Sequence, residues 1–253
     1  MIIAVVIGIL AMLTLSLGLI LFVVLYQRRV ISYQLELKKL SENQELELIH
    51  ASVQSEEDER ARIASELHDD VSTTLASARL FLHKTNDIFN EEDILTSKGL
   101  LDDTIIRIRE ISHKLQPATL QHLGLQSALQ SILDVLARSG EIKTSYIIHN
   151  TLPRLPDIVE LASYRICQEL ITNIHRHAKP SFLTLEGIVT LDKICLIFTH
   201  DGDGLTNDLF EKEIYKQNAN GLKNILNRLK LINASLQFSK EEGYSKSVLS
   251  IPC

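Results

Sequence analysis

The stretch Glu59-Arg-Ala-Arg-Ile-Ala-Ser-Glu-Leu-His-Asp69 opens a segment in which apolar residues recur at helical spacing. Intervals of three and four residues continue across residues 60–86 and predict an amphipathic α-helix. The apolar row of this helix is Ile63, Leu67, Val71, Leu75, Ala78 and Leu82. A second row predicts another amphipathic helix across residues 98–115. Its members are Leu101, Ile105, Ile108, Ser112 and Leu115.

These two helices predict an antiparallel hairpin with its connection near residues 90–97. One hairpin cannot bury both of its apolar faces, so two chains are expected to pair as a homodimer into a four-helix bundle. Pro117 lacks an amide hydrogen and cannot continue the second helix. We therefore expect a domain boundary there, with residues 59–117 as the dimerisation hairpin.

Residues 1–27 contain no charged side chain and consist mainly of Ile, Leu, Val and Ala. A helix of this length rises about 40 Å, which exceeds the roughly 30 Å of a bilayer's hydrocarbon core. We expect a single-pass transmembrane helix in contact with lipid; a buried core helix and a cleaved signal peptide are the alternatives. Because Arg28 and Arg29 follow at once, the positive-inside rule places the chain in the inner (cytoplasmic) membrane with its catalytic part in the cytoplasm.

The polar segment that follows, residues 28–58, contains neither Gly nor Pro. Leu46, Ile49 and Val53 stand at three-to-four spacing, which predicts a short coiled-coil signalling linker. A solvated single helix is the alternative. In either case the helix is expected to continue into the segment that begins at Glu59.

The composition excludes some classes of function. The net charge is −6 and no basic cluster with aromatic neighbours occurs, which argues against direct contact with nucleic acid. The cysteines Cys167, Cys195 and Cys253 are far apart and form no C-x-x-C pair. They are expected to be free thiols in a reducing compartment, without a metal.

Residues 118–253 alternate between helical and β-rich runs, which predicts a separate domain. Helices are expected at residues 125–137, 157–178 and 221–232. Strands are expected at residues 143–149, 182–191, 193–199, 235–239 and 247–251, the second and third paired around Asp192. Residues 201–220 are expected to form a polar loop. The predicted fold class is therefore α + α/β: an N-terminal helical part, then an α/β sandwich with helices stacked on one face of a mixed sheet.

The first chemical candidate is His68. It follows Leu67 of the apolar row and is expected about 100° round the helix, at the edge of the stripe and open to solvent. Imidazole can act as a nucleophile near neutral pH when a base holds its other nitrogen. The adjacent Asp69 is the candidate for orienting the ring and accepting its proton. A surface histidine among surface acids is the alternative.

The predicted helix over residues 157–178 carries a polar row at intervals of four residues. Its members are Arg165, Glu169, Asn173 and His177, with Arg176 beside them. A carboxylate and an amide one turn apart suit a Mg²⁺ ion that keeps several waters and bridges phosphates. Glu169 and Asn173 are therefore the candidate metal ligands. An ordinary amphipathic helix with a polar flank is the alternative.

Two glycine-bearing loops follow, one at residues 200–204 and one at residues 218–223. Glycine lets backbone approach a nucleotide closely, and a helix that begins at Gly221 presents free N–H groups to phosphates. Each loop alone is compatible with an ordinary turn, but their order after the histidine helix and the polar row indicates nucleotide binding. The candidates are Asp201, Gly202, Gly204, Gly221, Leu222 and Lys223.

From Glu59 to Pro252 the chain resembles the small sensor histidine kinases that work with NarL/LuxR-type regulators. The matching motifs are E-R-x-R-I-A-x-E-L-H-D at residues 59–69, L-x-P at 115–117, G-L-x-x-A-L at 124–129, R-I-x-Q-E-x-x-x-N-x-x-x-H-A at 165–178 and G-L-x-x-[IM]-x-x-R at 221–228. The resemblance implies a dimeric hairpin carrying His68 and a Bergerat-fold (GHKL) ATP-binding domain over residues 118–253. It further implies Mg²⁺ and ATP as cofactors, with Glu169 and Asn173 at the Mg²⁺–ATP site and Arg176 and His177 beside them. Asn173 is the preferred direct ligand of the metal, and Glu169 is also a candidate catalytic residue.

The function implied by this resemblance is that of a membrane-bound sensor histidine kinase. It would autophosphorylate His68 from Mg²⁺–ATP and transfer the phosphoryl group to an aspartate of a response regulator, whose output domain is expected to be a helix-turn-helix. One alternative is a degenerate kinase that acts as a non-enzymatic scaffold or heterodimer partner. Another is an ATPase of the Hsp90 or mismatch-repair type.

The chain departs from the family pattern at four positions. His200 stands where the family has an aspartate that accepts a hydrogen bond from the adenine amino group, and Asp201 follows one residue later. Ala219 replaces a glycine of the second loop, and Ser72 stands where a glycine is usual. Thr73 replaces a glutamine that positions water for phosphatase action in many members, and it remains a candidate for holding that water.

Overall fold

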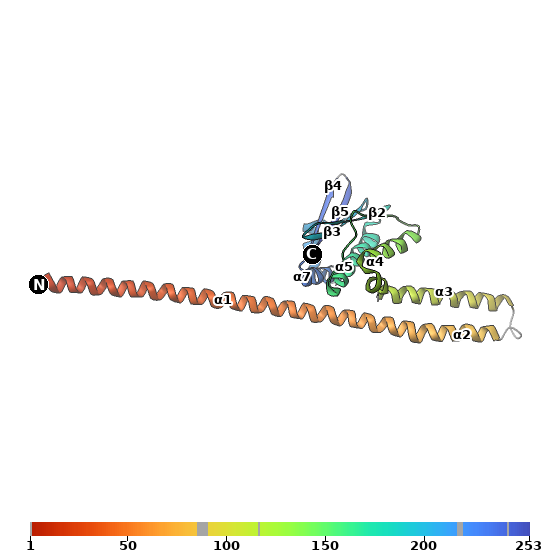
Figure 1. Cartoon of the computed structure of the whole chain (residues 1–253), viewed down its shortest axis with the longest axis horizontal. Helices are drawn as coiled ribbons and strands as arrows, with labels where there is room; N and C mark the ends of the chain where they lie inside the picture. Colours follow the sequence, from red (N-terminus) through yellow and green to blue (C-terminus); the bar gives the residue numbers. More distant parts are fainter. Residues whose placement is uncertain (1, 85–90, 116, 217–219, 242) are drawn as a thin grey trace. The chain divides into compact units, whose positions relative to one another are not determined.

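The computed structural model describes residues 2–84, 91–115, 117–216, 220–241 and 243–253 (Figure 1). The chain falls into two units, residues 1–50 and 51–253. Helix α1 (Ile2–Glu66) begins in the first unit and ends in the second. Its N-terminal part is long and apolar enough to cross a membrane, and 0% of the apolar window is buried. This exposure argues against a core helix, while the signal-peptide alternative stays open.

The predicted helical hairpin is present in the second unit. Its elements are the end of α1, the π-helical turn η1 (Leu67–Val71), α2 (Ser72–Lys84) and α3 (Glu91–Leu115). Helix α3 packs beside α2 (Figure 1). The Ser112 hydroxyl donates to the Ala64 carbonyl oxygen at 3.1 Å, and Arg79 pairs with Asp102 at 3.0 Å. The hairpin is confirmed, and its pairing into a four-helix bundle stays a prediction.

Two details of the hairpin differ from the prediction. Helix α3 begins at Glu91, so most of the connection predicted near residues 90–97 is helical; Asn90 lies outside the described residues. The sequence Glu91-Glu-Asp93 is favourable at a helix start, because acidic residue types are preferred in the first turn. The regular helix predicted through His68 contains the π turn η1, which widens the hydrogen-bonding step to five residues.

The C-terminal part of the second unit is a five-stranded mixed sheet. Its strands are β1 (Lys143–Ile148), β2 (Phe182–Val189), β3 (Lys193–His200), β4 (Ser235–Glu241) and β5 (Tyr244–Pro252). The spatial order is β1-β2-β3-β5-β4, with β1 and β2 parallel and the other neighbours antiparallel. The β2–β3 register pairs Val189 with Ile194, which confirms the pairing predicted around Asp192.

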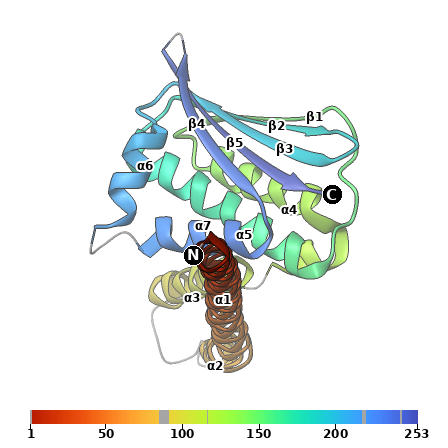
Figure 2. The ribbon, with the colours of Figure 1, turned by 90° about the vertical axis from the view of Figure 1, so that its left-hand side faces the viewer.

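Helices cover one face of this sheet (Figure 2). They are α4 (Ala118–Arg138), α5 (Asp157–Asn173) with its π-helical extension η2 (Ile174–Ala178), α6 (Asn207–Ile214) and α7 (Asn220–Leu231). Alternate strand residues such as Leu196 and Phe198 are fully buried, as is Ile166 of α5. The alternate, buried residues of the strands thus pack against the apolar stripe of the helices. This arrangement, called the α/β sandwich below, confirms the predicted fold class.

Helix α6 lies in a segment for which the sequence analysis predicted a polar loop. The Thr206 hydroxyl caps it by accepting a hydrogen bond from the Leu209 N–H at 3.3 Å. Phe210 is buried and its ring centroid lies 5.1 Å from that of Phe238. The helix has only eight residues, and its mostly polar composition hid the apolar side that holds it to the sheet.

Gly124 generates a stability prediction because α4 is kinked there, with φ 79° and ψ 179°. This region of backbone space is essentially restricted to glycine. An added Cβ would also lie 3.1 Å from Cδ of Arg154. We expect Gly124→Ala to lower the free energy of unfolding by about 1–3 kcal/mol, measured by urea denaturation followed by circular dichroism.

The matched control for this substitution is Leu123→Ala, whose side chain is 66% exposed. An exposed truncation beside the kink should change the free energy of unfolding by about 0.5 kcal/mol or less. An unchanged urea midpoint for Gly124→Ala, or equal losses in the two variants, would contradict the assignment of strain to Gly124.

Candidate functional site

A cavity of about 600 Å³ lies in the α/β sandwich where α5, η2, α6 and α7 meet β3, β4 and β5. Within the described part of the chain, its lining comes from residues 169–247. The apolar lining consists of Leu170, Ile174, Ala178, Leu205, Leu209, Leu222 and Phe238. The polar and charged lining includes Glu169, Asn173, Arg176, His177, His200, Asp203, Glu213, Lys216 and Ser247. Small-molecule sites of roughly 300–1,000 Å³ are usual, so the size suits a nucleotide.

One wall of the cavity comes from α5 and η2. Glu169 and Asn173 lie one turn apart on α5, as predicted, and both line the cavity. The helix then changes to the π turn η2, which adds Arg176 and His177 to the lining. Arg165, the first member of the predicted polar row, lies outside this cavity because its guanidinium is paired with Glu57 at 2.7 Å.

The loop after β3 approaches its neighbours so closely that only glycine fits. A Cβ on Gly202 would lie 2.2 Å from the Ala178 carbonyl oxygen, and one on Gly204 would lie 2.3 Å from Cβ of Ser245. The Ser245 hydroxyl donates to the Gly202 carbonyl oxygen at 2.9 Å and holds the loop in place. Gly204 lines the cavity, whereas Gly202 serves to position the loop.

The structure separates the roles of His200 and Asp201. The Asp201 carboxylate accepts hydrogen bonds from the Ser181 N–H at 2.8 Å, from the Ser181 hydroxyl and from the Phe182 N–H at 3.2 Å. The hydrogen bond from the Ser181 side chain is the main reason that the pKa of Asp201 lies below its ordinary value. Asp201 does not line the cavity, whereas His200 does. Asp201 therefore fixes the start of β2.

The His200 ring is almost completely buried, with 1% of the residue exposed. Its Nδ1 atom is buried and has no hydrogen-bond partner among the described residues. Burial lowers the pKa of His200, and Lys240 acts in the same direction, while Asp201 raises it. The ring is therefore neutral at pH 7 and cannot reproduce the charge of an aspartate. An unpartnered buried polar atom also carries a free-energy cost.

Another part of the lining comes from the first turn of α7. Gly221 and Leu222 line the cavity, and no acidic residue occurs in this turn. The first N–H groups of a helix have no partner within it, and the helix dipole favours anions there. A Cβ on Gly221 would lie 2.0 Å from Oε1 of Glu169, so glycine brings this helix end close to that carboxylate. Lys223, also a predicted ligand, does not line the cavity.

These groups fit Mg²⁺ and ATP. In the part of the chain that the structure describes, no cluster of three or more His, Cys, Asp or Glu side chains could hold a metal by itself. A Mg²⁺ ion at a phosphate site typically takes one or two protein ligands and completes its shell with waters and phosphate oxygens. Glu169 and Asn173 offer that number of ligands. The apolar lining suits a base, and Arg176 with the start of α7 suits the phosphates.

The histidine helix lies outside this cavity. His68 belongs to η1, and Asp69 is exposed and accepts a hydrogen bond from the Ser65 hydroxyl at 3.1 Å. Thr73 is exposed on α2. The structure gathers part of the predicted set at the cavity, without Asp69 or Thr73. The predicted ligands that line it are Glu169, Asn173, Arg176, His177, Gly204, Gly221 and Leu222. The side chain of His68 lies outside the described part of the chain. Ala219 lies outside the described residues.

Sequence reasoning missed the wall that α6 and the sheet contribute. From α6 and its flanks come Leu205, Leu209, Glu213 and Lys216, and from the sheet come Phe238 and Ser247. The capping residue Thr206 ahead of two apolar residues was an available signal for α6. Phe238 and Ser247 reach the cavity through strand pairing over a long sequence distance, which no local pattern reveals.

The comparisons with known proteins concern the chain as a whole. Residues 59–120 match the histidine kinase family model HisKA_3. The sensor histidine kinase MctS of Rhizobium johnstonii is 25% identical over 221 residues, covering 85% of this chain and 48% of MctS. The histidine-protein kinase/phosphatase UhpB of Salmonella typhimurium is 26% identical over 225 residues, covering 85% of this chain and 42% of UhpB. ComP of Bacillus subtilis, a sensor histidine kinase, is 30% identical over 202 residues, covering 74% of this chain and 25% of ComP.

Among solved structures, the histidine kinase domain of the blue-light-activated kinase EL346 from Erythrobacter litoralis aligns with a TM-score of 0.46 and 15% identity, over 72% of this chain and 95% of that domain. The chain spans about half the length of these curated relatives or less. The sequence matches, together with the family model, establish descent from a common group. The chain is a homologue of the sensor histidine kinases of two-component systems.

Proposed function

We propose that this chain is a membrane-anchored sensor histidine kinase. It binds Mg²⁺–ATP in the cavity of the α/β sandwich, phosphorylates its own His68 and transfers the phosphoryl group to an aspartate of a response regulator. The observation that carries this proposal is the convergence of Glu169, Asn173 and the start of α7 on one cavity, in a chain homologous to sensor histidine kinases.

Different residues of the cavity bind the base, the phosphates and the Mg²⁺ ion. The apolar lining takes the base, and the N–H groups at Gly221 with the Arg176 guanidinium take the phosphates. Asn173, assisted by Glu169, holds the Mg²⁺ ion. Bound Mg²⁺ neutralises charge on the phosphate oxygens.

Transfer then requires His68 to meet the γ-phosphoryl group in line. A ring nitrogen of His68 forms the new bond to phosphorus while the bond to the β,γ-bridging oxygen breaks and ADP leaves. Asp69 orients the ring and accepts the proton of the other nitrogen. Because η1 and α2 contribute no described residue to the cavity lining, we infer that the sandwich swings about the segment at Pro117. Catalysis is then mainly positioning and charge neutralisation.

The rest of the chain determines the membrane attachment and the partners of the kinase. Residues 1–27 anchor it in the lipid of the cytoplasmic membrane, and everything beyond Arg28 is cytoplasmic. Apolar side chains of the hairpin that are exposed in the single chain, such as Val71, Ile106 and Ile111, pair two chains into a homodimer. The response regulator carries the receiver aspartate and a helix-turn-helix output domain, so this chain itself does not contact nucleic acid.

One observation favours a second candidate, a non-enzymatic scaffold that pairs with an active homologue. His200, neutral and buried, occupies the place of the base-reading aspartate. If the base cannot be held, the histidine helix has no phosphoryl donor. Measurable ATP affinity in the unmodified chain separates the kinase from the scaffold.

Autophosphorylation provides the direct test. The full chain in lipid nanodiscs, incubated with γ-labelled ATP and Mg²⁺, should acquire acid-labile label. His68→Gln should abolish the label because it removes the nucleophile, and Asn173→Ala should reduce the initial rate by roughly 10–100-fold because it weakens metal binding.

The matched control is His122→Gln, which changes an exposed histidine on α4 and should retain full label. Label that persists in His68→Gln would refute the assignment of the phosphoacceptor. No label in any variant, with no detectable ATP binding, would favour the scaffold.

The base partner is tested by His200→Asp. A carboxylate at this position should accept a hydrogen bond from the adenine amino group, and such charge-assisted bonds contribute about 1.5–3 kcal/mol. We therefore expect the dissociation constant for ATP, measured by calorimetry, to fall roughly tenfold or more. GTP is the control because guanine lacks that amino group. An equal gain for GTP, or no gain for ATP, would contradict the role of position 200.

A further inference from the structure

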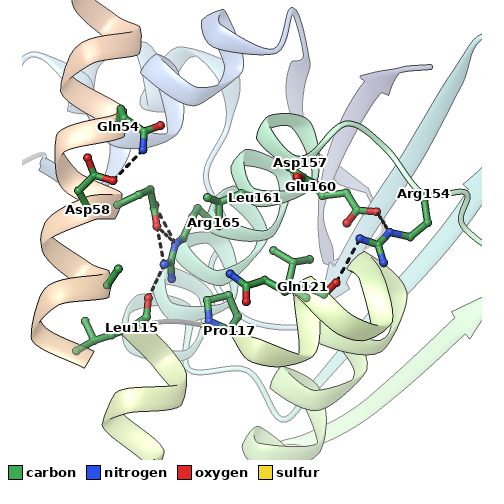
Figure 3. A pocket seen from close by; sticks show the side chains of 13 residues that line it. Gln54, Asp58, Leu115, Pro117, Gln121, Arg154, Asp157, Glu160, Leu161 and Arg165 are labelled. Atoms are coloured by element: carbon green, nitrogen blue, oxygen red, sulfur yellow. Dashed lines mark hydrogen bonds and ion pairs between the residues drawn. The ribbon is translucent and has the colours of Figure 1, made fainter. Parts of the chain in front are cut away.

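Two buried arginines of the α/β sandwich, Arg165 and Arg228, meet two glutamates of α1, Glu56 and Glu57. Figure 3 shows Arg165 of this group, with its bond to Leu115. Arg165 donates to Glu57 from Nε at 2.9 Å and from Nη2 at 2.7 Å. Nη2 of Arg228 donates to Glu56 at 2.9 Å and to Glu57 at 3.0 Å. Both arginine side chains are 4% exposed and that of Glu57 is 10% exposed. These four residues are called the junction cluster. Its two arginines and Glu57 are largely shielded from water, whereas the side chain of Glu56 is 29% exposed.

Arg165 joins three helices at this junction. Besides its bonds to Glu57, its Nη2 donates at 2.6 Å to the carbonyl oxygen of Leu115, the last residue of α3. Pro117 follows two residues later and lines the cavity of about 470 Å³ beside Arg165 (Figure 3). The junction cluster therefore lies at the segment about which the sandwich must swing in the proposed function.

Glu57 is the residue that both arginines share. Glu56 has a second partner on its own helix, because Arg60 donates to it at 2.8 Å. Burial raises the pKa of Glu56, but the hydrogen bonds and charges of Arg60 and Arg228 outweigh it and leave the pKa below its ordinary value. Neutralising Glu57 removes a charged partner from both arginines at once. A buried charge that loses its partner is strongly destabilised.

The junction cluster is connected to both sides of the proposed reaction. Glu57 precedes His68 by eleven residues (68 − 57), a rise of about 16 Å along a helix. Arg165 stands one turn before Glu169 on α5, and Arg228 lies on α7, the helix that begins beside Gly221. Among the described residues, η1 and α2 contribute nothing to the nucleotide cavity.

Phosphoryl transfer needs the reacting atoms about 3–3.5 Å apart. Ion pairs that hold both α5 and α7 at residue 57 therefore oppose the approach of the nucleotide to His68 of the same chain. We propose that Glu57, shared by Arg165 and Arg228, is the centre of an autoinhibitory latch that holds the sandwich away from His68, and that the kinase is switched on when these pairs break. This inference rests on the proposed kinase function.

The geometry also indicates how the latch is opened. Glu56 and Glu57 are adjacent and therefore point about 100° apart around α1, yet both contact Arg228. Rotation of the helix about its axis withdraws at least one carboxylate from the arginines. Because guanidinium–carboxylate pairs require a fixed planar geometry, a modest rotation suffices to break them. Signal input then acts as a twist or a shift of α1.

The test compares Glu57→Gln with the unmodified full chain in lipid nanodiscs. The initial rate of His68 labelling from γ-labelled ATP should rise at least threefold, while an unchanged far-UV circular dichroism spectrum shows that the sandwich stays folded. Arg228→Met, which keeps the aliphatic bulk but leaves no arginine charge there, should have the same effect. Asp58→Asn is the matched control, because this exposed neighbour bonds to Gln54 on its own helix. An unchanged or lower rate in Glu57→Gln and Arg228→Met would overturn the latch.

A second readout does not depend on kinase activity. Spin labels at Ser52→Cys on α1 and at Asp192→Cys in the turn after β2, with Cys195 and Cys253 changed to serine, report the distance between helix and sandwich. A single narrow distance distribution in the background with Glu57 intact, and a broad one with Glu57→Gln, would support the latch. This result would hold even if His68 acquired no labelled phosphate, in which case the kinase proposal alone would fail. An identical distribution in both overturns the latch whatever the activity.

Discussion

The burial of α5 against the sheet is the constraint on which the rest of the sandwich depends. Ile166 and Leu170 face the core with 0% and 3% of their surface exposed, so the helix cannot turn about its axis without losing that packing. Its other sides are thereby fixed in direction. Glu169 and Asn173 reach the cavity, and Arg165 reaches the end of α1. One packed face thus positions both the candidate metal ligands and the link to the histidine helix.

The chemistry of the first glycine loop follows from the position of His200 in the sheet. This residue ends β3, which is paired with β2 on one side and β5 on the other, and it falls on the buried side of the strand. Any side chain at this position is therefore buried. An acid here has to be stabilised by its ligand, whereas a histidine lowers its pKa and becomes neutral. The substitution at this position changes the charge that the base encounters without changing the fold around it.

Local patterns in the sequence predicted the helices and strands that contain long runs of regularly spaced apolar residues. They missed the features that depend on contacts between distant segments. The rows beginning at Ile63 and Leu101 predicted the hairpin, and β-rich runs predicted all five strands with ends shifted by a few residues. The π turns at Leu67–Val71 and Ile174–Ala178 have no signature in residue type. The sequence predicted Asp201 as a nucleotide ligand, whereas in the structure its carboxylate is held by Ser181, twenty residues earlier. Likewise, nothing near Arg165 in the sequence points to Glu57, 108 residues earlier.

If the junction cluster is a latch, its connection to the nucleotide cavity must work in both directions. Arg165 and Glu169 stand on one rigid helix, and Arg228 and Gly221 stand on another. A change of free energy at the junction that alters the placement of these helices alters the affinity for nucleotide, and by thermodynamic linkage bound nucleotide alters the stability of the ion pairs by the same factor. The coupling free energy is large because the arginines are buried, so a guanidinium that leaves Glu57 must find water or another acceptor. The sandwich and α1 are therefore coupled by the ion pairs as well as by the covalent connection at Pro117.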